Sequence, residues 1–274
     1  MDETIFEVED IYFQYINRSL GINGVSLKVY KTEALTILGA NGSGKSTLLK
    51  ILDGLYFPQR GKVRAFGEEL SENTLKKEDF SRDFRKRVGF VFQDPDVQLF
   101  LPSVKDEIAF APLQMDMEKE EVEKRIKMAC EHLGIGHLLD RAPYHLSGGE
   151  KKKVALASIL TLEPEVWLLD EPTASLDPKT REWVKEFLLG LKEKKKTIIL
   201  ATHDLDIARW IGDRCIVLGE DHRIMAEGNI EDILANRKVL IKANLISPSS
   251  FPLKGLDPST EGEIQITQAH MAQR

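Results

Sequence analysis

One short stretch, residues 39–47, constrains the fold of this chain more than any other. It reads GANGSGKST, follows the apolar run 34–38 and precedes a helical pattern that starts at Lys45. The stretch fits G-x-x-x-x-G-K-[ST], a loop between a strand and a helix whose backbone N–H groups cradle phosphate oxygens. It therefore predicts a strand–loop–helix unit that binds a nucleoside triphosphate, with a ligand-free glycine-rich turn as the alternative.

Each part of this loop has a physical role. Gly39, Gly42 and Gly44 let the backbone approach an anion closely, and the helix N-terminus adds partial positive charge. Lys45 can reach the β- and γ-phosphates, and the hydroxyl of Ser46 can bind Mg²⁺. The loop alone names no reaction, because kinases, GTPases and transport ATPases share it.

Two adjacent carboxylates follow the apolar run 166–169, in the stretch VWLLDEPTASLD. Such a run is typical of a buried parallel strand, which carries functional groups at its C-terminal end. Asp170 suits a ligand of Mg²⁺, and Glu171 can polarise an attacking water as a general base. We find no acceptor site for a kinase reaction, so the pair favours hydrolysis. Two acids that cap the strand by chance are the alternative, which the upstream P-loop disfavours.

A second candidate anion site lies at residues 146–150, which read LSGGE. Ser147 is a natural N-cap, and Gly148 and Gly149 bare the amides of the first helical turn. A single nucleotide hardly needs two phosphate-binding helix ends. We therefore expect this end to serve the γ-phosphate held by a partner subunit, with an ordinary capped helix as the alternative.

Together the three stretches resemble the nucleotide-binding subunits of the ABC (ATP-binding cassette) family, over roughly residues 3–235. The resemblance makes the first stretch the Walker A loop and the third the signature motif. It makes Asp170 the Walker B aspartate and Glu171 the catalytic glutamate, and it places a D-loop at residues 174–177, where two subunits meet. One departure is the run EKKK at residues 150–153, where many relatives carry a glutamine and an arginine.

Three further residues gain a role from this resemblance alone. His203, in TIILATHDLD, is similar to the switch histidine that senses the γ-phosphate. Gln93, in VGFVFQDPD, is similar to the Q-loop glutamine that contacts Mg²⁺ and the attacking water. Tyr15 lies 24 residues before Gly39, where the family stacks an aromatic ring on adenine. Taken singly, Tyr15 also fits plain strand packing, and His203 fits a helix cap.

The predicted site uses ATP and Mg²⁺ as cofactors. The predicted catalytic residues are Glu171, His203 and Gln93, and the predicted ligands of Mg²⁺ are Ser46, Gln93 and Asp170. The predicted contacts to the nucleotide are Tyr15, Gly39, Asn41, Gly42, Ser43, Gly44, Lys45, Ser46, Thr47, Ser147, Gly148 and Gly149.

Alternating apolar runs and helical patterns predict an α/β fold of the P-loop NTPase (RecA-like) class, with a mainly parallel sheet covered on both faces. Patterns at residues 7–15 and 24–29 predict an N-terminal antiparallel β subdomain. Between residues 104 and 162 the chain reads as mainly helical, so we expect an inserted α-helical subdomain over about 96–162. Further strand candidates are residues 34–38, 61–66, 88–92, 166–169, 197–201, 215–218 and 223–227.

We assign residues 1–236 to the ATPase domain and residues 237–274 to a C-terminal extension that is irregular or partly helical. The net charge of −6 argues against a surface that coats nucleic acid. No apolar run approaches the roughly 20 residues that span a bilayer, and the acidic start is unlike a signal peptide. Cys130 and Cys215 are expected to be buried free thiols. We therefore expect a peripheral subunit at the cytoplasmic face of the cell membrane.

The stretch after Gln93 narrows the resemblance. QDPDVQLF and VKDEIAFAP, at residues 93–100 and 104–112, resemble energy-coupling-factor importers and their cobalt and nickel relatives. That type pairs the ATPase with a transmembrane coupling subunit and a substrate-binding membrane subunit. We expect an exposed apolar docking surface formed by Leu99, Phe100, Leu101, Val104, Ile108, Phe110 and Ala111. Packing of residues 99–101 inside the subdomain is the alternative.

For the cargo, the resemblance favours Co²⁺ or Ni²⁺, with a vitamin as the alternative. A soluble ABC ATPase that acts on ribosomes, DNA or Fe–S assembly remains a second class. Ribosome-type members usually fuse two cassettes and DNA-repair members insert a long coiled coil, whereas this chain has one cassette and an acidic balance. We expect a homodimer or heterodimer of ATPase subunits that closes head to tail around two ATP·Mg²⁺.

Overall fold

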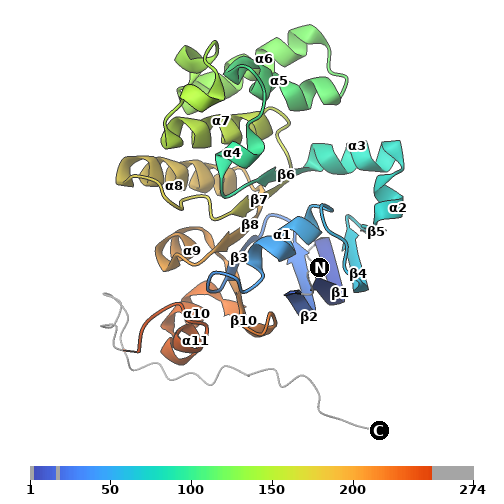
Figure 1. The fold of residues 1–274 in the computed structure, drawn as a ribbon, viewed down its shortest axis with the longest axis vertical. Helices are drawn as coiled ribbons and strands as arrows, with labels where there is room; N and C mark the ends of the chain where they lie inside the picture. The colour runs from blue at the N-terminus through green and yellow to red at the C-terminus, as the bar shows by residue number, and fades with distance from the viewer. Residues whose placement is uncertain (1–2, 17–18, 249–274) are drawn as a thin grey trace.

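The computed structural model describes residues 3–16 and 19–248, so the predicted extension beyond residue 248 lies outside the described residues. A sheet of six strands forms the centre of the molecule, in the order β10-β9-β3-β8-β7-β6 (Figure 1). All pairs are parallel except β10 with β9. The strands are β3 (Ala34–Leu38), β6 (Val88–Val91), β7 (Val166–Asp170), β8 (Thr197–Thr202), β9 (Arg214–Leu218) and β10 (Ile224–Asn229).

Both faces of this sheet are covered, as a fully apolar parallel sheet requires. Every residue of β3, β6, β7 and β8 is buried. Trp167 and Leu169 of β7 belong to the core on one face, with the helices that follow β6. Val166 and Leu168 belong to the core on the other face, with the first strands of the chain and the helix after β3. The predicted α/β class is confirmed.

The second sheet is antiparallel, in the order β2-β1-β4-β5. Its strands are β1 (Thr4–Gln14), β2 (Leu20–Tyr30), β4 (Arg60–Ala65) and β5 (Glu68–Glu69). The predicted N-terminal β subdomain is therefore present, and the strand expected at residues 61–66 belongs to it. β2 begins four residues before the predicted strand at 24–29. These first residues show no clear alternation of apolar and polar side chains, so the sequence did not indicate them.

The helical insertion separates β6 from β7 and lies at one end of the molecule (Figure 1). It contains α4 (Pro95–Gln98), α5 (Val104–Gln114), α6 (Lys119–Leu133) and α7 (Gly148–Leu160), with short 3₁₀ turns η1 (Gly136–Leu138) and η2 (Pro143–His145). The apolar stripe of α6 is buried, with Val122, Ile126, Ala129 and Leu133 at 2–4% exposure. The predicted inserted subdomain is thus confirmed as part of the fold.

The remaining helices are α1 (Lys45–Leu52), α2 (Glu72–Leu75), α3 (Glu78–Arg87), α8 (Pro178–Glu193), α9 (Leu205–Ile211), α10 (Ile230–Ala235) and α11 (Arg237–Lys242). α2 and α3 were not predicted, because they carry almost no apolar stripe: Phe84 is the single buried residue of α3. Both cysteines are buried and free, Cys130 in α6 and Cys215 in β9. Among the described helices, none combines the length and the hydropathy needed to cross a bilayer.

The predicted docking surface is partly wrong. Leu99, Val104 and Ile108 are 8%, 0% and 0% exposed and belong to the core of the helical subdomain. Val104 and Ile108 lie one helical turn apart on the buried side of α5. Phe100 and Phe110 do remain exposed, at 66% and 40%, and their rings meet edge to face at 5.5 Å. We call this exposed pair the Phe100–Phe110 patch.

A buried ion pair ties α3 to the end of α1. Asp53, 4% exposed, accepts from the guanidinium of Arg85 at 2.9 Å. Burial raises the pKa of the Asp53 carboxyl to about 6, although Arg85 opposes the shift. Because the folded pKa lies above the unfolded value of about 3.9, this group stabilises the fold at low pH and loses that contribution as pH rises through the folded pKa.

Asp53→Asn is therefore expected to shift the pH dependence of stability. Between about pH 5 and pH 7.5, the free energy of unfolding of the variant should gain roughly 1–2 kcal/mol relative to the wild type. Urea titrations of both proteins at the two pH values measure this difference. Asp83→Asn, on the exposed side of α3, is the control, and its difference in free energy of unfolding from the wild type should be the same at both pH values. A difference for Asp53→Asn that does not change with pH would contradict the raised pKa of Asp53.

Candidate nucleotide site

The sheet brings three loops to one edge. Leu38 at the end of β3 pairs with Thr202 at the end of β8, and Asp170 at the end of β7 pairs with Ala201. The Walker A loop follows β3, Glu171 follows β7, and His203 follows β8. Ligands of open α/β sheets bind outside these carboxyl ends. The register of the sheet therefore gathers residues that lie more than a hundred positions apart in the sequence.

The Walker A loop presents a bare helix end. Gly44 is the N-cap of α1 at φ 104°, and no described side chain caps this end. A Cβ on Gly44 would lie 2.4 Å from the carbonyl oxygen of Gly21, so glycine is required here. The hydroxyl of Ser43 is buried without a hydrogen-bond partner among the described residues. Free amides at a helix N-terminus and an unpaired buried hydroxyl fit a phosphate group.

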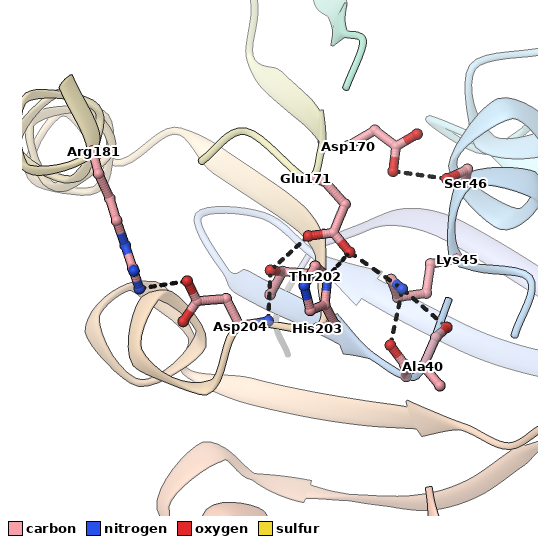
Figure 2. Close-up of polar contacts among 10 residues, drawn as sticks. Ala40, Lys45, Ser46, Asp170, Glu171, Arg181, Thr202, His203 and Asp204 are labelled. Atoms are coloured by element: carbon pink, nitrogen blue, oxygen red, sulfur yellow. Dashed lines mark hydrogen bonds and ion pairs between the residues drawn. The ribbon is translucent and has the colours of Figure 1, made fainter. Parts of the chain in front are cut away.

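Lys45 lies folded over this loop. Its side chain is 5% exposed, and its ammonium donates to the carbonyl oxygens of Gly39 at 2.9 Å and Ala40 at 3.2 Å. The same Nζ lies 3.3 Å from Oε1 of Glu171 (Figure 2). The pair links the loop after β3 to the end of β7. Because both groups are desolvated, each depends on the other for its charge compensation.

Glu171 is the centre of the polar network in Figure 2. One carboxylate oxygen accepts from the hydroxyl of Thr202 at 3.0 Å, and the other lies 2.8 Å from Nδ1 of His203. The residue is 4% exposed and has φ 42°, in the left-handed region that non-glycine residues seldom adopt. This backbone turn aims the carboxylate at the Walker A loop. Such costly geometry is typical of functional sites.

A second pair of oxygens lies beside it. The hydroxyl of Ser46 donates to Oδ1 of Asp170 at 2.9 Å, joining α1 to β7. Burial raises the pKa of Asp170, and the hydrogen bond from Ser46 opposes that shift. A carboxylate and a hydroxyl on two rigid elements form an oxygen donor set suited to a hard divalent cation. The donor set therefore fits the predicted metal.

The loop after β8 is held from both sides. The hydroxyl of Thr202 accepts from the backbone N–H of Asp204 at 3.0 Å. The carboxylate of Asp204 caps α9 and pairs with Arg181 near the start of α8 (Figure 2). This arrangement fixes the backbone on which His203 sits. Thr202 was missed in the sequence, where its one signal is a polar residue at the end of an apolar strand.

Tyr15 lies at the other side of α1. Its hydroxyl is 2.7 Å from Oγ1 of Thr47, and its ring meets Phe13 and Tyr56 edge to face at 5.1 and 5.9 Å. The ring is thus partly used in packing, as the simpler interpretation expected. Its half-buried position beside the first turn of α1 also leaves an aromatic surface next to the Walker A loop.

The signature residues lie on a different element. Ser147 caps α7: its hydroxyl accepts from the backbone N–H of Glu150, whose carboxylate accepts from the N–H of Ser147 in return. A Cβ on Gly149 would lie 2.7 Å from the hydroxyl of Thr180. Within residues 3–16 and 19–248, no hydrogen bond or ion pair joins Ser147, Gly148 or Gly149 to the Walker A loop.

Gln93 is also separate from the network around Glu171. Its side chain is exposed and makes no hydrogen bond in the described part of the chain, whereas its carbonyl oxygen accepts from Lys152 at 2.9 Å. Lys152 was another residue missed in the sequence, since a lysine inside the run EKKK looks like a solvated charge. The structure thus gathers Lys45, Ser46, Asp170, Glu171 and His203, and leaves Gln93 and the signature residues apart.

Comparison with known proteins decides the family. The model of the ABC transporter family matches residues 22–174, more than half of the 274-residue chain. The chain belongs to the ABC transporter family. It is an ATP-binding subunit of this family and hence an ATPase that serves a membrane transporter complex.

Three relatives illustrate the similarity of this ABC ATPase. The nickel import ATP-binding protein NikO of Rhodobacter capsulatus is 46% identical over 244 residues, which cover 88% of this chain and 95% of NikO. The energy-coupling factor transporter ATP-binding protein EcfA of Methanocaldococcus jannaschii is 41% identical, over 89% of this chain and 86% of EcfA. The structure of cbiO1 from Clostridium perfringens, part of the ABC transporter complex cbiONQ, matches with a TM-score of 0.74 and 35% identity, over 90% of this chain and 97% of cbiO1.

Proposed function

We propose that this ABC ATPase hydrolyses ATP to drive an energy-coupling-factor type importer for Ni²⁺ or Co²⁺. The similarity to NikO along nearly the whole length of both chains carries the choice of cargo. The relative EcfA supports the importer type without naming a cargo, so import of a vitamin is the alternative. A soluble ABC ATPase is disfavoured, because the relatives described above are all named as transporter subunits.

The Walker A loop would hold the triphosphate of ATP. The free amides of α1 and the buried hydroxyl of Ser43 face such an anion, and Lys45 exchanges its carbonyl acceptors for phosphate oxygens. Tyr15 offers its ring to the base. The other predicted contacts, Asn41 and Thr47, lie in the same loop and in the first turn of α1.

Ser46, Asp170 and Gln93 are the proposed ligands of Mg²⁺. When bound, the ion neutralises charge on the β- and γ-phosphates. The first two oxygens are already adjacent, whereas the exposed side chain of Gln93 makes no hydrogen bond to either residue in the described part of the chain. A bound cation would also compensate the charge of the Asp170 carboxylate, whose pKa is raised by burial.

Glu171 is the proposed general base. Its carboxylate receives the proton of the attacking water, while Thr202 and His203 hold it in place. The same carboxylate lies 3.3 Å from the ammonium of Lys45, so the proposed base and the proposed phosphate-binding cation are in direct contact.

Completion of the site requires a second copy or a paralogous subunit. Ser147, Gly148 and Gly149 form an N-terminal helix end that the same chain does not bring to its Walker A loop. Head-to-tail closure would place that end on the γ-phosphate of the partner's nucleotide. Because the chain carries both halves, two identical copies are sufficient for two complete sites.

Transport by the assembled complex tests the proposal. Proteoliposomes that contain this subunit with its membrane partners should take up Ni²⁺ or Co²⁺ when ATP is supplied, and should not take up a vitamin. Uptake of a vitamin without either metal would establish the alternative cargo. Absence of any transport partner in detergent extracts would favour the soluble class.

The Phe100–Phe110 patch is the proposed contact with the transmembrane partner, and Phe100 follows Gln93 by seven residues in the chain. Phe100→Asp should abolish uptake and co-purification, because a desolvated interface rejects an unpaired charge at a cost of roughly 2–5 kcal/mol. The ATPase rate of the isolated subunit should stay within about threefold of the wild type, since the residue is exposed.

Two controls separate docking from folding. Met128→Asp changes another exposed apolar residue of the subdomain, 51% exposed, and should leave uptake intact. Leu99→Asp changes a core residue and should lower the melting temperature and the ATPase rate together. Retained co-purification of Phe100→Asp, or a loss of folding like that of Leu99→Asp, would remove the patch from the interface.

A further inference from the structure

Lys152 is a buried lysine that the proposed mechanism does not use. It is 1% exposed and is one of the largest fully buried side chains among the described residues. Its ammonium donates to the carbonyl oxygens of Phe92 at 3.1 Å and Gln93 at 2.9 Å. A buried cation is costly unless its N–H groups are satisfied. The acceptors that satisfy this one belong to the first two residues after β6, at the start of the loop that carries Gln93, which we call the Q-loop.

A lysine side chain carries an ammonium with three N–H donors, and the carboxylates of Asp170 and Asp94 act on it through space. Charged donors make stronger hydrogen bonds to carbonyl oxygens than neutral ones do. The contacts to Phe92 and Gln93 are thus charge-assisted bonds inside a water-poor region.

A second side chain holds the same segment. Gln98 of α4 accepts from the backbone N–H of Phe92 at 3.2 Å through Oε1, and its Nε2 donates to the carbonyl oxygen of Ala155 at 2.8 Å. Nearby, Lys151 pairs with Asp96 at 2.6 Å. The backbone at the start of the Q-loop is therefore bonded, directly or through α4, to the signature helix α7.

We infer that Lys152 is a positioning residue, which fastens the backbone of Gln93 to the signature helix so that the two move together. The inference rests on the proposed roles of Gln93 and of Ser147–Gly149. Lys152 lies five residues after Ser147, about 7.5 Å along a rigid helix. A displacement of the signature end by the partner's γ-phosphate thus reaches Gln93 through a single helix and two hydrogen bonds.

The role of Lys152 fits the run EKKK at the start of the signature helix. Glu150 completes the cap of Ser147, and Lys151 and Lys152 bind α4 and the Q-loop. Lys153 lies 4.6 Å from the ring centroid of Trp183 in α8. Each charged side chain of the run has a partner, and only Lys152 reaches a residue of the proposed metal site.

The first measurement is hydrogen exchange of the full chain without nucleotide. Lys152→Met keeps most of the side-chain volume and removes the donor. It should accelerate amide exchange about tenfold or more in a peptide that covers residues 89–99, and leave residues 39–50 unchanged. Lys153→Met, one residue along, is the matched control and should change neither peptide. If Lys152→Met lowers the melting temperature sharply, Lys152→Gln, which retains an amide donor, should show a smaller acceleration confined to the same peptide.

The second measurement is a double-mutant cycle on ATP hydrolysis. Gln93→Ala and Lys152→Met should each lower kcat about tenfold with the affinity for ATP unchanged, and the double variant should be no slower than Gln93→Ala alone. Effects that multiply, or unchanged exchange in residues 89–99, would overturn the inference. If Gln93→Ala hydrolyses ATP at the wild-type rate while Lys152→Met still accelerates exchange, the proposed role of Gln93 fails and the fastening by Lys152 stands.

Discussion

Glu171→Gln is expected to bind ATP as the wild-type chain does and to lose roughly a thousandfold in kcat, within the 10²–10⁴ that a general base supplies. The amide oxygen of glutamine still accepts from Thr202, so the shape of the site is kept. The amide has no basicity, so it takes no proton from water. Lys45 retains the carbonyl oxygens of Gly39 and Ala40, and phosphate binding is preserved.

Single-turnover hydrolysis and equilibrium nucleotide binding measure the two halves of this expectation. Glu165→Gln changes the glutamate just before the opposite end of β7, where it pairs with Arg87, and is the matched control with a wild-type rate. With ATP·Mg²⁺ the stalled Glu171→Gln protein should accumulate as a dimer in light scattering. Adding Ser147→Arg should abolish that dimer. A wild-type single-turnover rate in Glu171→Gln would show that another group is the base.

The parallel sheet was predictable because its strands are apolar on both faces. Runs such as TIIL in β8 have no alternating polar residues, and their burial follows directly. α3 carried no such signal: it reads EDFSRDFRKR and buries only Phe84. Its position depends on tertiary contacts, including the pair of Arg85 with Asp53. A helix that buries one aromatic ring and is otherwise held by ion pairs, such as Arg85 with Asp53 and Arg87 with Glu165, leaves little apolar periodicity in the sequence.

The site was predictable where a motif places residues at the end of a strand. Lys45, Asp170 and His203 each follow an apolar run, and the sheet register then brings them to one edge. Contacts between distant side chains left no such trace. The predicted docking surface included too many residues. Leu99 and Phe100 are adjacent and equally apolar in the sequence, yet of these two only Phe100 is exposed. The direction of a side chain at a short turn is set by packing, which sequence spacing does not encode.

Lys45→Met is expected to lower the affinity for ATP by about a hundredfold or more, since roughly 3 kcal/mol of charge-assisted contact to phosphate is lost. The variant should also be less stable. Loss of the ammonium leaves the buried carboxylate of Glu171 without its cation. The hydrogen bonds from Thr202 and His203 to this carboxylate compensate in part. We expect the free energy of unfolding to fall by roughly 1–3 kcal/mol, somewhat less than for a buried pair with no other partner.

The double variant Lys45→Met, Glu171→Gln separates these two effects. Removing the stranded charge should restore most of the stability, because a neutral amide needs no cation, whereas ATP binding should remain lost. Lys50→Met, five residues along α1 and over the ring of Tyr56, is the matched control and should bind ATP normally. Calorimetric titration with ATP measures the affinity, and urea unfolding measures the free energy of unfolding. Both are measured for the wild type, Lys45→Met, the double variant and Lys50→Met. Recovery of ATP affinity in the double variant would mean that the charge of Glu171, rather than the loss of the ammonium, had weakened binding, and Lys45 would lose its assignment to the phosphates.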